Sequence, residues 1–372
     1  MQEKYTNPLK YGVVKAQRAA LKRMIGDLVR WSPLESPRAG FSVIIGCNAR
    51  LRAVARANLM MLSRQRLDGL AEVILVWDRP AEKMPESFTD RLAKEFPDLP
   101  LRVLHYSSEQ HRRATRINWA WVYAWMSWSI GIGACSTRHA MLHDFDAMLL
   151  EPGVLRRRFE IATERGVEYL GVKHYDGNGI LLSDELVTTF EMMFDAAFVR
   201  SNFKPIDLFN HVTRYNGRTV DFDTFLWAES RAGRTAVVAL PEEEMVHPTQ
   251  MICQFTQLVD ADEQPFKQNN LLMIPYFEYV GGDSQRLVAL TEAIAALKGG
   301  EPTVEFFGKP MSLANLTSVH AAWLRKQAGR MEAATVGAMR PEVEAYFNAI
   351  DAWVGFDRGP IEAAAPSQHQ PA

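Results

Sequence analysis

Asp144 and Asp146 are the residues best suited by type and spacing to do chemistry, because the two carboxylates stand one position apart directly after an apolar run. In a turn at the end of a strand, both side chains can converge on one cation. Carboxylate oxygens suit Mg²⁺ or Mn²⁺, which proteins commonly bind through one or two carboxylates together with substrate phosphates. The pair therefore predicts a site for a divalent cation and a diphosphate, and a solvated turn is the alternative.

The elements that must position this pair read as alternating strands and helices. Four short apolar runs are typical of buried strands: residues 41–48, 71–78, 101–107 and the first part of 137–152. Helical spacing separates them, at residues 50–65, 85–95 and 114–129. This alternation predicts an α/β fold with a mainly parallel sheet flanked by helices. Ligands bind at the carboxyl ends of such strands, so one crevice is expected to collect the polar residues found there: Asn48, Asp78, Ser107 and Asp144.

The second half of the chain is more mixed. Strands are expected within residues 168–176 and 233–247, and helices within 184–201 and 220–233. A C-terminal run of helices is expected at 283–299, 313–334 and 341–354. We therefore divide the chain into an N-terminal helix and linker (1–37), a main domain (38–262), a helical extension (263–358) and a disordered tail (359–372).

Composition excludes several classes of protein. The 372 residues are 47% hydrophobic, and 42 Lys and Arg against 44 Asp and Glu give a net charge of −2. Extensive disorder and non-specific nucleic-acid binding are not expected at this balance. The three cysteines, Cys47, Cys135 and Cys253, form neither a disulfide framework nor a zinc pattern, which favours a reducing, cytoplasmic compartment. The first residues do not resemble a signal peptide.

Residues 8–31 predict a basic amphipathic helix. Its apolar residues follow helical spacing, and its charged residues are one acid, Asp27, and six bases: Lys10, Lys15, Arg18, Lys22, Arg23 and Arg30. A helix of this kind can lie on an anionic membrane surface, which predicts peripheral contact with the inner face of a membrane. Packing on the main domain or on another subunit is the alternative. The oligomeric state is left open by the sequence.

The order of motifs resembles one family. The runs SVIIGCNAR, EVILVWDRP, TRINWAW and AMLHDFDAMLLEP follow one another as in glycosyltransferases of the GT-A fold, most closely the family-2-like group. Two departures are visible: GCN replaces the usual PTYN, and Ile117 separates Arg116 from Asn118. The resemblance covers roughly residues 41–152. It implies a nucleotide-diphospho-sugar transferase fold and a nucleotide-sugar donor.

The resemblance also implies roles for individual residues. Asp144 and Asp146 would hold Mn²⁺ or Mg²⁺, and Asp144 would also approach the donor. The other donor-binding positions implied are Gly46, Cys47, Asn48, Asp78 and Arg116. The alternatives from the residues alone are a turn cap for Asp78 and a surface ion pair for Arg116.

The resemblance implies three further groups of residues in the expected site. An acidic pair after the metal motif supplies the base of inverting enzymes, and here Asp223 is the first candidate and Asp221 the second, with plain helix capping as the alternative. His247 would complete the metal site, with a core histidine as the alternative. His174 and Tyr175 would contact the acceptor from a glycine-containing turn.

The function expected from this reading is transfer of a sugar from a nucleotide donor to a glycan or lipid-linked acceptor. The DFDAML run also resembles haloacid-dehalogenase-type phosphohydrolases, in which the motif follows the first strand. A non-catalytic domain that binds a nucleotide or glycan is the third possibility. The donor base, the sugar and the stereochemical outcome are not fixed by the sequence.

Overall fold

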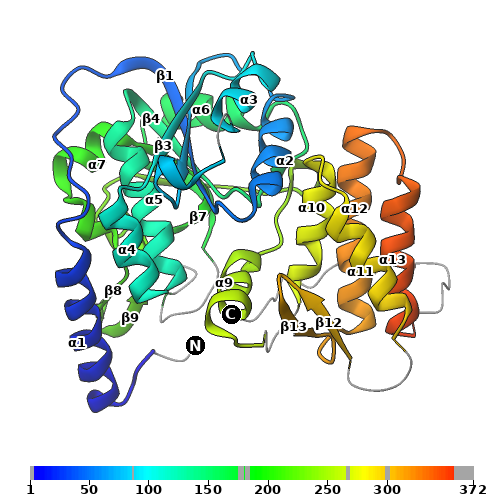
Figure 1. Ribbon diagram of the computed structural model, residues 1–372. Coiled ribbons are helices and arrows are strands. Elements are labelled where there is room, and N and C mark those ends of the chain that lie inside the picture. Colours follow the sequence, from blue (N-terminus) through cyan, green and yellow to red (C-terminus); the bar gives the residue numbers. More distant parts are fainter. Residues whose placement is uncertain are drawn as a thin grey trace. The chain divides into compact units, whose positions relative to one another are not determined.

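The structure is a computed structural model that describes residues 4–85, 88–174, 180, 185–264, 269–297 and 302–355. The chain divides into two compact units, Met1–Pro248 and Thr249–Ala372. The first unit is built on a seven-stranded sheet and the second is mostly helical (Figure 1). The finer four-part division stays a prediction.

The sheet of the first unit has the strand order β10-β6-β7-β4-β1-β2-β3. Its strands are β1 (Arg38–Cys47), β2 (Leu70–Trp77), β3 (Leu101–His105), β4 (Thr137–His143), β6 (Tyr169–Lys173), β7 (Val187–Asp195) and β10 (Thr235–Val238). All neighbours pair in parallel except β7, which runs antiparallel to β4 and β6. The expected α/β fold class, with a mainly parallel sheet flanked by helices, is confirmed.

Helices cover both faces of this sheet. They are α1 (Pro8–Ile25), α2 (Arg52–Leu62), α3 (Phe88–Glu95), α4 (Ser108–Ile117), α5 (Ala120–Ala134), α6 (Val154–Arg165) and α7 (Ala196–Asn202). On β4, His139 contacts the Phe159 ring of α6, whereas the next residue, Ala140, packs in the core that contains Trp125 of α5. Successive strand residues point to opposite faces, so α5 and α6 lie on opposite sides of the sheet.

Two segments expected to be helical contain strands instead. Residues 184–201 form β7 before the short α7, because β7 lies between β4 and β6 and its backbone is paired on both sides. Residues 220–233 contain the end of β9 (Arg218–Phe222), which pairs with β8 (His211–Tyr215), followed by the one-turn α8 (Leu226–Glu229). Strand pairing decided both segments: β7 lies between two other strands, and β9 forms a hairpin with the adjacent β8.

The second unit contains the three expected C-terminal helices, α11 (Gln285–Ala295), α12 (Ser318–Thr335) and α13 (Pro341–Trp353). Two further helices, α9 (Met251–Ala261) and α10 (Met273–Val280), precede them and were not expected. A hairpin of β12 (Thr303–Phe306) and β13 (Lys309–Ser312) was not expected; its turn uses the positive φ angles of Phe307 and Gly308. No helix in the described part of the chain combines the length and apolar character needed to cross a membrane.

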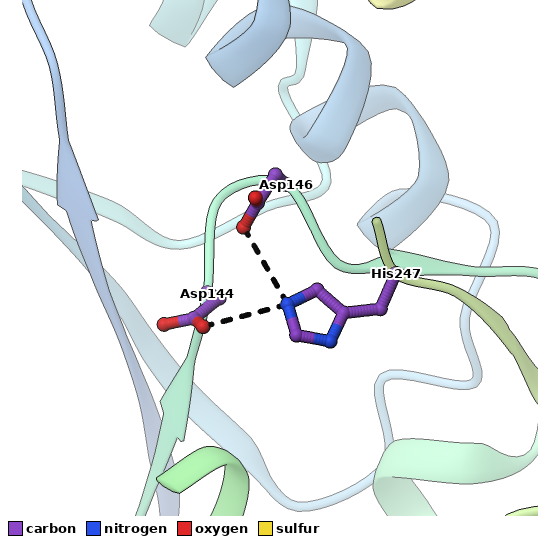
Figure 2. A group of neighbouring side chains, drawn as sticks. All are labelled: Asp144, Asp146 and His247. Atoms are coloured by element: carbon purple, nitrogen blue, oxygen red, sulfur yellow. Dashed lines mark ion pairs between the residues drawn. The ribbon is translucent and has the colours of Figure 1, made fainter. Parts of the chain in front are cut away.

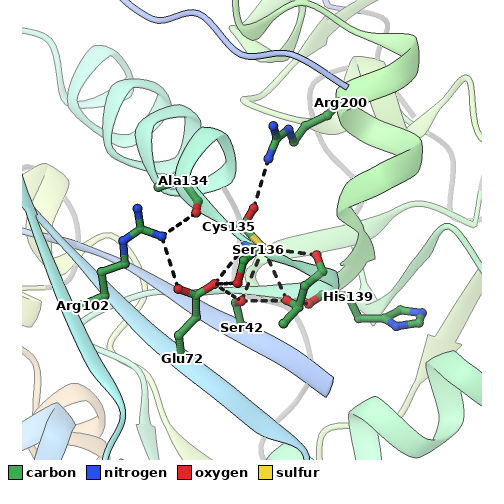
Figure 3. Close-up of polar contacts among 9 residues, drawn as sticks. Ser42, Glu72, Arg102, Ala134, Cys135, Ser136, His139 and Arg200 are labelled. Atoms are coloured by element: carbon green, nitrogen blue, oxygen red, sulfur yellow. Dashed lines mark hydrogen bonds and ion pairs between the residues drawn. The ribbon is translucent and has the colours of Figure 1, made fainter. Parts of the chain in front are cut away.

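A polar cluster closes the amino edge of the sheet, where β1, β2 and β4 begin (Figure 3). Glu72 Oε1 accepts hydrogen bonds from the Ser42 hydroxyl, the Ser136 amide and the Ser136 hydroxyl, each at 2.9 Å. Arg102 lies 3.5 Å from the other carboxylate oxygen and donates to the Ala134 carbonyl. Because Glu72 is buried and so fully hydrogen-bonded, the amino edge has a structural role, which leaves the opposite edge for function.

Candidate functional site

The carboxyl edge of the sheet gathers the polar residues that follow β1, β2, β3 and β4. These four strands are mutually parallel, so their carboxyl ends share one edge. Asp78 ties two of the loops together: its Oδ1 accepts a hydrogen bond from the Ala49 amide at 2.9 Å, and its own amide donates to the Cys47 carbonyl at 3.1 Å. Burial raises the pKa of Asp78, while the Ala49 amide opposes that shift.

Asp144, Asp146 and His247 converge at this edge (Figure 2). One ligand atom from each residue lies within 4.8 Å of the others. His247 Nε2 is 3.6 Å from Asp144 Oδ2 and 3.8 Å from Asp146 Oδ1. The Asp146 side chain is 5% exposed, whereas that of Asp144 is 31% exposed, so Asp144 forms the open side of the group.

Two local features bring these residues together although His247 is about a hundred positions away in sequence. The chain turns directly after β4, where the Ala147 amide donates to the Asp144 carbonyl at 2.9 Å. It then enters β5 (Met148–Leu149), which pairs antiparallel with β11 (Met245–Val246). Val246 pairs with Met148, so the next residue, His247, lies beside the Asp144–Asp146 turn.

Asn58 of α2 holds the turn from behind. Its Nδ2 lies 2.9–3.2 Å from the carbonyl oxygens of Asp144, Phe145 and Ala147, and 3.1 Å from His143 Nε2. Sequence reasoning missed Asn58. The available signal was a polar residue among apolar positions of the helix expected at 50–65, which local periodicity alone does not connect to the turn.

A buried ion-pair network supports His247 from the other side. Glu244, at the start of the β11 segment, accepts hydrogen bonds from Arg157 at 2.8 Å and Arg158 at 2.7 Å, both on α6. The Phe190 ring of β7 lies 4.5 Å from the His247 ring. These contacts fix the backbone and the ring plane, so the imidazole is held in place before any ligand arrives.

The donor set fits a divalent cation. Burial raises the pKa of Asp146, and the nearby Asp144 carboxylate adds to that shift. Burial alone would lower the pKa of His247, but the two carboxylates raise it above its usual value. Two carboxylates and an imidazole are ligands suited to Mn²⁺ or Mg²⁺, and in the described part of the chain no Lys or Arg forms an ion pair with either carboxylate. His143, the last residue of β4, is buried against Asn58, and burial lowers its pKa to about 4.

The two base candidates have different surroundings. Asp221 of β9 is engaged by the N-terminal segment: the Tyr5 hydroxyl donates to its Oδ2 at 2.8 Å, and Arg18 lies 3.8 Å away. Asp223 accepts from Asn210 Nδ2 at 3.0 Å and from the Thr224 amide at 3.1 Å, both at Oδ1. Burial raises the pKa of Asp223, and these two donors oppose that shift.

The remaining predicted positions show other local roles. A Cβ on Gly46 would lie 2.7 Å from the Ser127 Cβ of α5, so close helix packing already requires glycine there. Cys47 is buried, and Asn48 Oδ1 accepts from the Arg50 amide in the turn after β1. Arg116 is exposed in the last turn of α4.

Of the two predicted acceptor residues, the structure describes only His174. His174 is buried, and burial lowers its pKa to about 4. Tyr175 lies outside the described residues. The Asp144–Asp146 turn follows the fourth strand, β4, which disfavours the haloacid-dehalogenase alternative, in which the motif follows the first strand.

No protein-family model and no curated protein matches this chain. Among solved structures, S. aureus TarS 1-349 is similar at 12% identity over 86% of this chain and 92% of that one, with a TM-score of 0.38, and it was also solved with UDP and with UDP-GlcNAc. The mannosyltransferase PcManGT from Pyrobaculum calidifontis, solved with GDP-Man and Mn²⁺, is similar at 13% identity over 94% and 98% of the two chains, with a TM-score of 0.34. At such scores the likeness carries no functional argument, so function is argued from the residues of this chain.

Proposed function

We propose that this protein is a metal-dependent glycosyltransferase that moves a sugar from a nucleoside-diphosphate donor to a glycan or lipid-linked acceptor. The observation that carries the proposal is the convergence of Asp144, Asp146 and His247 at the carboxyl edge of a parallel sheet. Open α/β sheets bind ligands at this edge, and such a donor set suits a cation that also contacts phosphate oxygens.

The donor would occupy the open side of this group. Asp144, Asp146 and His247 would hold Mn²⁺ or Mg²⁺, and the cation when bound would neutralise charge on the departing diphosphate. Asp144 is the more exposed carboxylate, which suits a residue that also faces the donor. Asp78 and the 46–48 segment would bind the nucleoside, and Arg116 would approach the phosphates.

Asp223 is the proposed base of an inverting transfer. The acceptor oxygen attacks the sugar C1, its proton passes to the Asp223 carboxylate, and the electron pair of the breaking C1–O bond leaves with the diphosphate. Both described hydrogen bonds of Asp223 end on Oδ1, which favours Oδ2 as the proton acceptor, whereas Asp221 is occupied by Tyr5 and Arg18. A raised pKa also makes a carboxylate a better base near neutral pH.

His174 and Tyr175 are proposed to contact the acceptor, and the transfer is proposed to take place in the cytoplasm at the inner face of a membrane. This location suits a lipid-linked acceptor, because its headgroup is presented at the bilayer surface.

Thermal unfolding with Mn²⁺ and a nucleoside diphosphate tests the proposal. UDP and GDP are the first probes, followed by dTDP and CDP, and the right nucleotide should raise Tm only when Mn²⁺ is present, because a ligand that binds the native state alone stabilises it. Asp146→Asn should abolish the rise. Asp262→Asn, a change to an exposed carboxylate in the second unit, should preserve it.

Two results would contradict the proposal in different ways. Absence of any Mn²⁺-dependent shift with all four nucleotides would remove the donor site. Asp223→Asn is expected to retain the nucleotide shift and lose turnover by about 10²-fold or more, the range typical of a general base. Near-normal turnover in this variant would leave the donor site intact and remove the base assignment.

A further inference from the structure

Helix α1 packs on the first unit through a mixed inward face. Arg18 is only 8% exposed, lies 3.8 Å from Asp221 and stacks over the Trp119 ring at 4.3 Å. One turn further on, Lys22 Nζ is 2.9 Å from His211 Nδ1 of β8. At the end of the helix, Ile25 is buried in the hydrophobic core of the first unit, so apolar packing and these polar contacts together hold the helix in place.

The outward face of α1 is apolar. Leu9 is 81% exposed, Val13 67% and Met24 48%. Ala16 and Ala20 are exposed on the same helical face, since positions 9, 13, 16, 20 and 24 follow the 3.6-residue repeat. Among the described residues nothing covers this stripe. A row of large aliphatic side chains exposed to water is unfavourable, and such rows usually mark a surface that binds a partner.

The charge on α1 indicates which partner. The helix carries five cations, Lys10, Lys15, Arg18, Lys22 and Arg23, and no acid, although the whole chain has a net charge of −2. The nearest acid in sequence, Asp27, is already paired with Arg113 at 2.6 Å. An apolar stripe flanked by lysine and arginine is the pattern of a helix that lies in the interface of an anionic bilayer.

We propose that α1 docks this protein on membranes containing anionic lipids, with Leu9, Val13 and Met24 entering the acyl boundary. Figure 1 shows α1 along the outside of the first unit beside β8, a position from which the stripe can meet a flat surface. A second copy of the chain fits less well, because pairing two stripes would bring the exposed cations of both helices, Lys10, Lys15 and Arg23, close together without an acid on α1 to pair them. The inference concerns a surface and does not depend on the proposed chemistry.

Flotation with lipid vesicles tests the docking surface. The intact chain should bind vesicles of phosphatidylcholine with about a quarter phosphatidylserine, and binding should weaken with added salt because the charges are exposed. The double variant Leu9→Glu/Val13→Glu should bind at least about tenfold more weakly, because two inserted aliphatic side chains are lost. Val319→Glu is the matched control, since Val319 is 79% exposed on α12 and is expected to change nothing.

Three results would overturn membrane docking by α1. Failure of the intact chain to bind these vesicles would overturn the proposal, as would equal binding by the double variant and the Val319→Glu control. Sedimentation velocity without lipid tests whether a second copy of the chain occupies the stripe instead. A dimer that the intact chain forms and the double variant does not form would assign the stripe to a second copy and overturn membrane docking. Circular dichroism of each variant confirms that α1 and the fold persist, and both substituted side chains are too exposed to disturb packing.

Discussion

At the scale of single residues, the Asn58 side chain holds the backbone of the Asp144–Asp146 turn. Its Nδ2 lies within hydrogen-bond distance of three carbonyl oxygens of that turn. Asn58→Asp preserves size but replaces the donor with an oxygen facing those carbonyls. Unpaired buried polar groups of this kind cost about 1–3 kcal/mol each. We expect Mn²⁺ affinity, measured by titration of the free-ion paramagnetic resonance signal, to fall by at least about tenfold.

A second buried asparagine provides the control for this prediction. Asn270 is also buried and donates through Nδ2 to a backbone carbonyl, that of Thr249, at 2.7 Å. Asn270→Asp should lower stability to a similar degree while Mn²⁺ binding stays at the wild-type level. A folded Asn58→Asp protein that binds Mn²⁺ normally would show that the turn does not need this amide.

Residues near a strand end could be placed from the sequence, whereas their supports could not. The convergence of Asp144 with Asp146 follows from their spacing, and His247 followed from a family pattern. Asn58 contacts the turn across more than 80 positions of chain, and Glu244 contacts Arg158 across a similar span. Such partners are set by how helices dock on the sheet, which local periodicity does not encode.

At the scale of elements, close packing of α5 on β1 depends on glycine. A Cβ added to Gly131 would collide with Cγ2 of Ile44, a stiff β-branched side chain on a central strand. Gly131→Ala should therefore destabilise the protein by about 1–3 kcal/mol in urea unfolding, although alanine is the better helix former. The loss comes from overpacking between the helix and the sheet.

Gly12 of α1 supplies the opposite case in the same experiment. A Cβ added there meets nothing within 4 Å. Gly12→Ala should leave stability unchanged or raise it by up to about 1 kcal/mol, because only the helix propensity changes. Equal destabilisation by both substitutions would contradict the packing explanation for Gly131.

The segments that sequence patterns described wrongly are those whose conformation is decided by pairing with another strand. The alternation of strands and helices up to β4 was predictable, because each parallel strand and its helix form a local unit. Strand β7 carries a mixed pattern that also suits a helix, and its pairing with β4 and β6 decides its conformation. The two-residue pairing of β5 with β11 is too short to leave any periodic signal, yet it brings His247 to the site.

At the scale of the whole molecule, the first unit separates stability from proposed function at the two edges of one sheet. The amino edge is closed by a buried carboxylate with a full set of donors, as Figure 3 shows around Glu72. At the carboxyl edge, Asp144 and Asp146 face one another and an imidazole, and the described residues supply no comparable set of donors to them (Figure 2). The second arrangement leaves charge for a ligand to neutralise, which is why two buried acids, Glu72 and Asp146, receive different roles.

Glu72→Gln tests this separation. Burial alone would raise the pKa of Glu72, but hydrogen bonds from Ser136 and Ser42 lower it below its usual value. A folded-state pKa below the unfolded one means that the carboxylate stabilises the fold above the unfolded value, near 4.5, and that this stabilisation is lost as pH falls through the folded value. At pH 7, Glu72→Gln should therefore cost about 1–3 kcal/mol in urea unfolding.

The same variant should differ less and less from wild type as the pH falls below about 4.5, because protonation removes the charge from Glu72 as well. Its Mn²⁺ affinity at pH 7 should equal that of wild type, since Glu72 stands at the edge opposite Asp146. The Asn58→Asp protein should show the reverse, with weakened Mn²⁺ binding at pH 7. If Glu72→Gln weakened Mn²⁺ binding as Asn58→Asp does, the two edges would be coupled through the strands. The proposed separation of a stabilising edge from a ligand-binding edge would then be wrong.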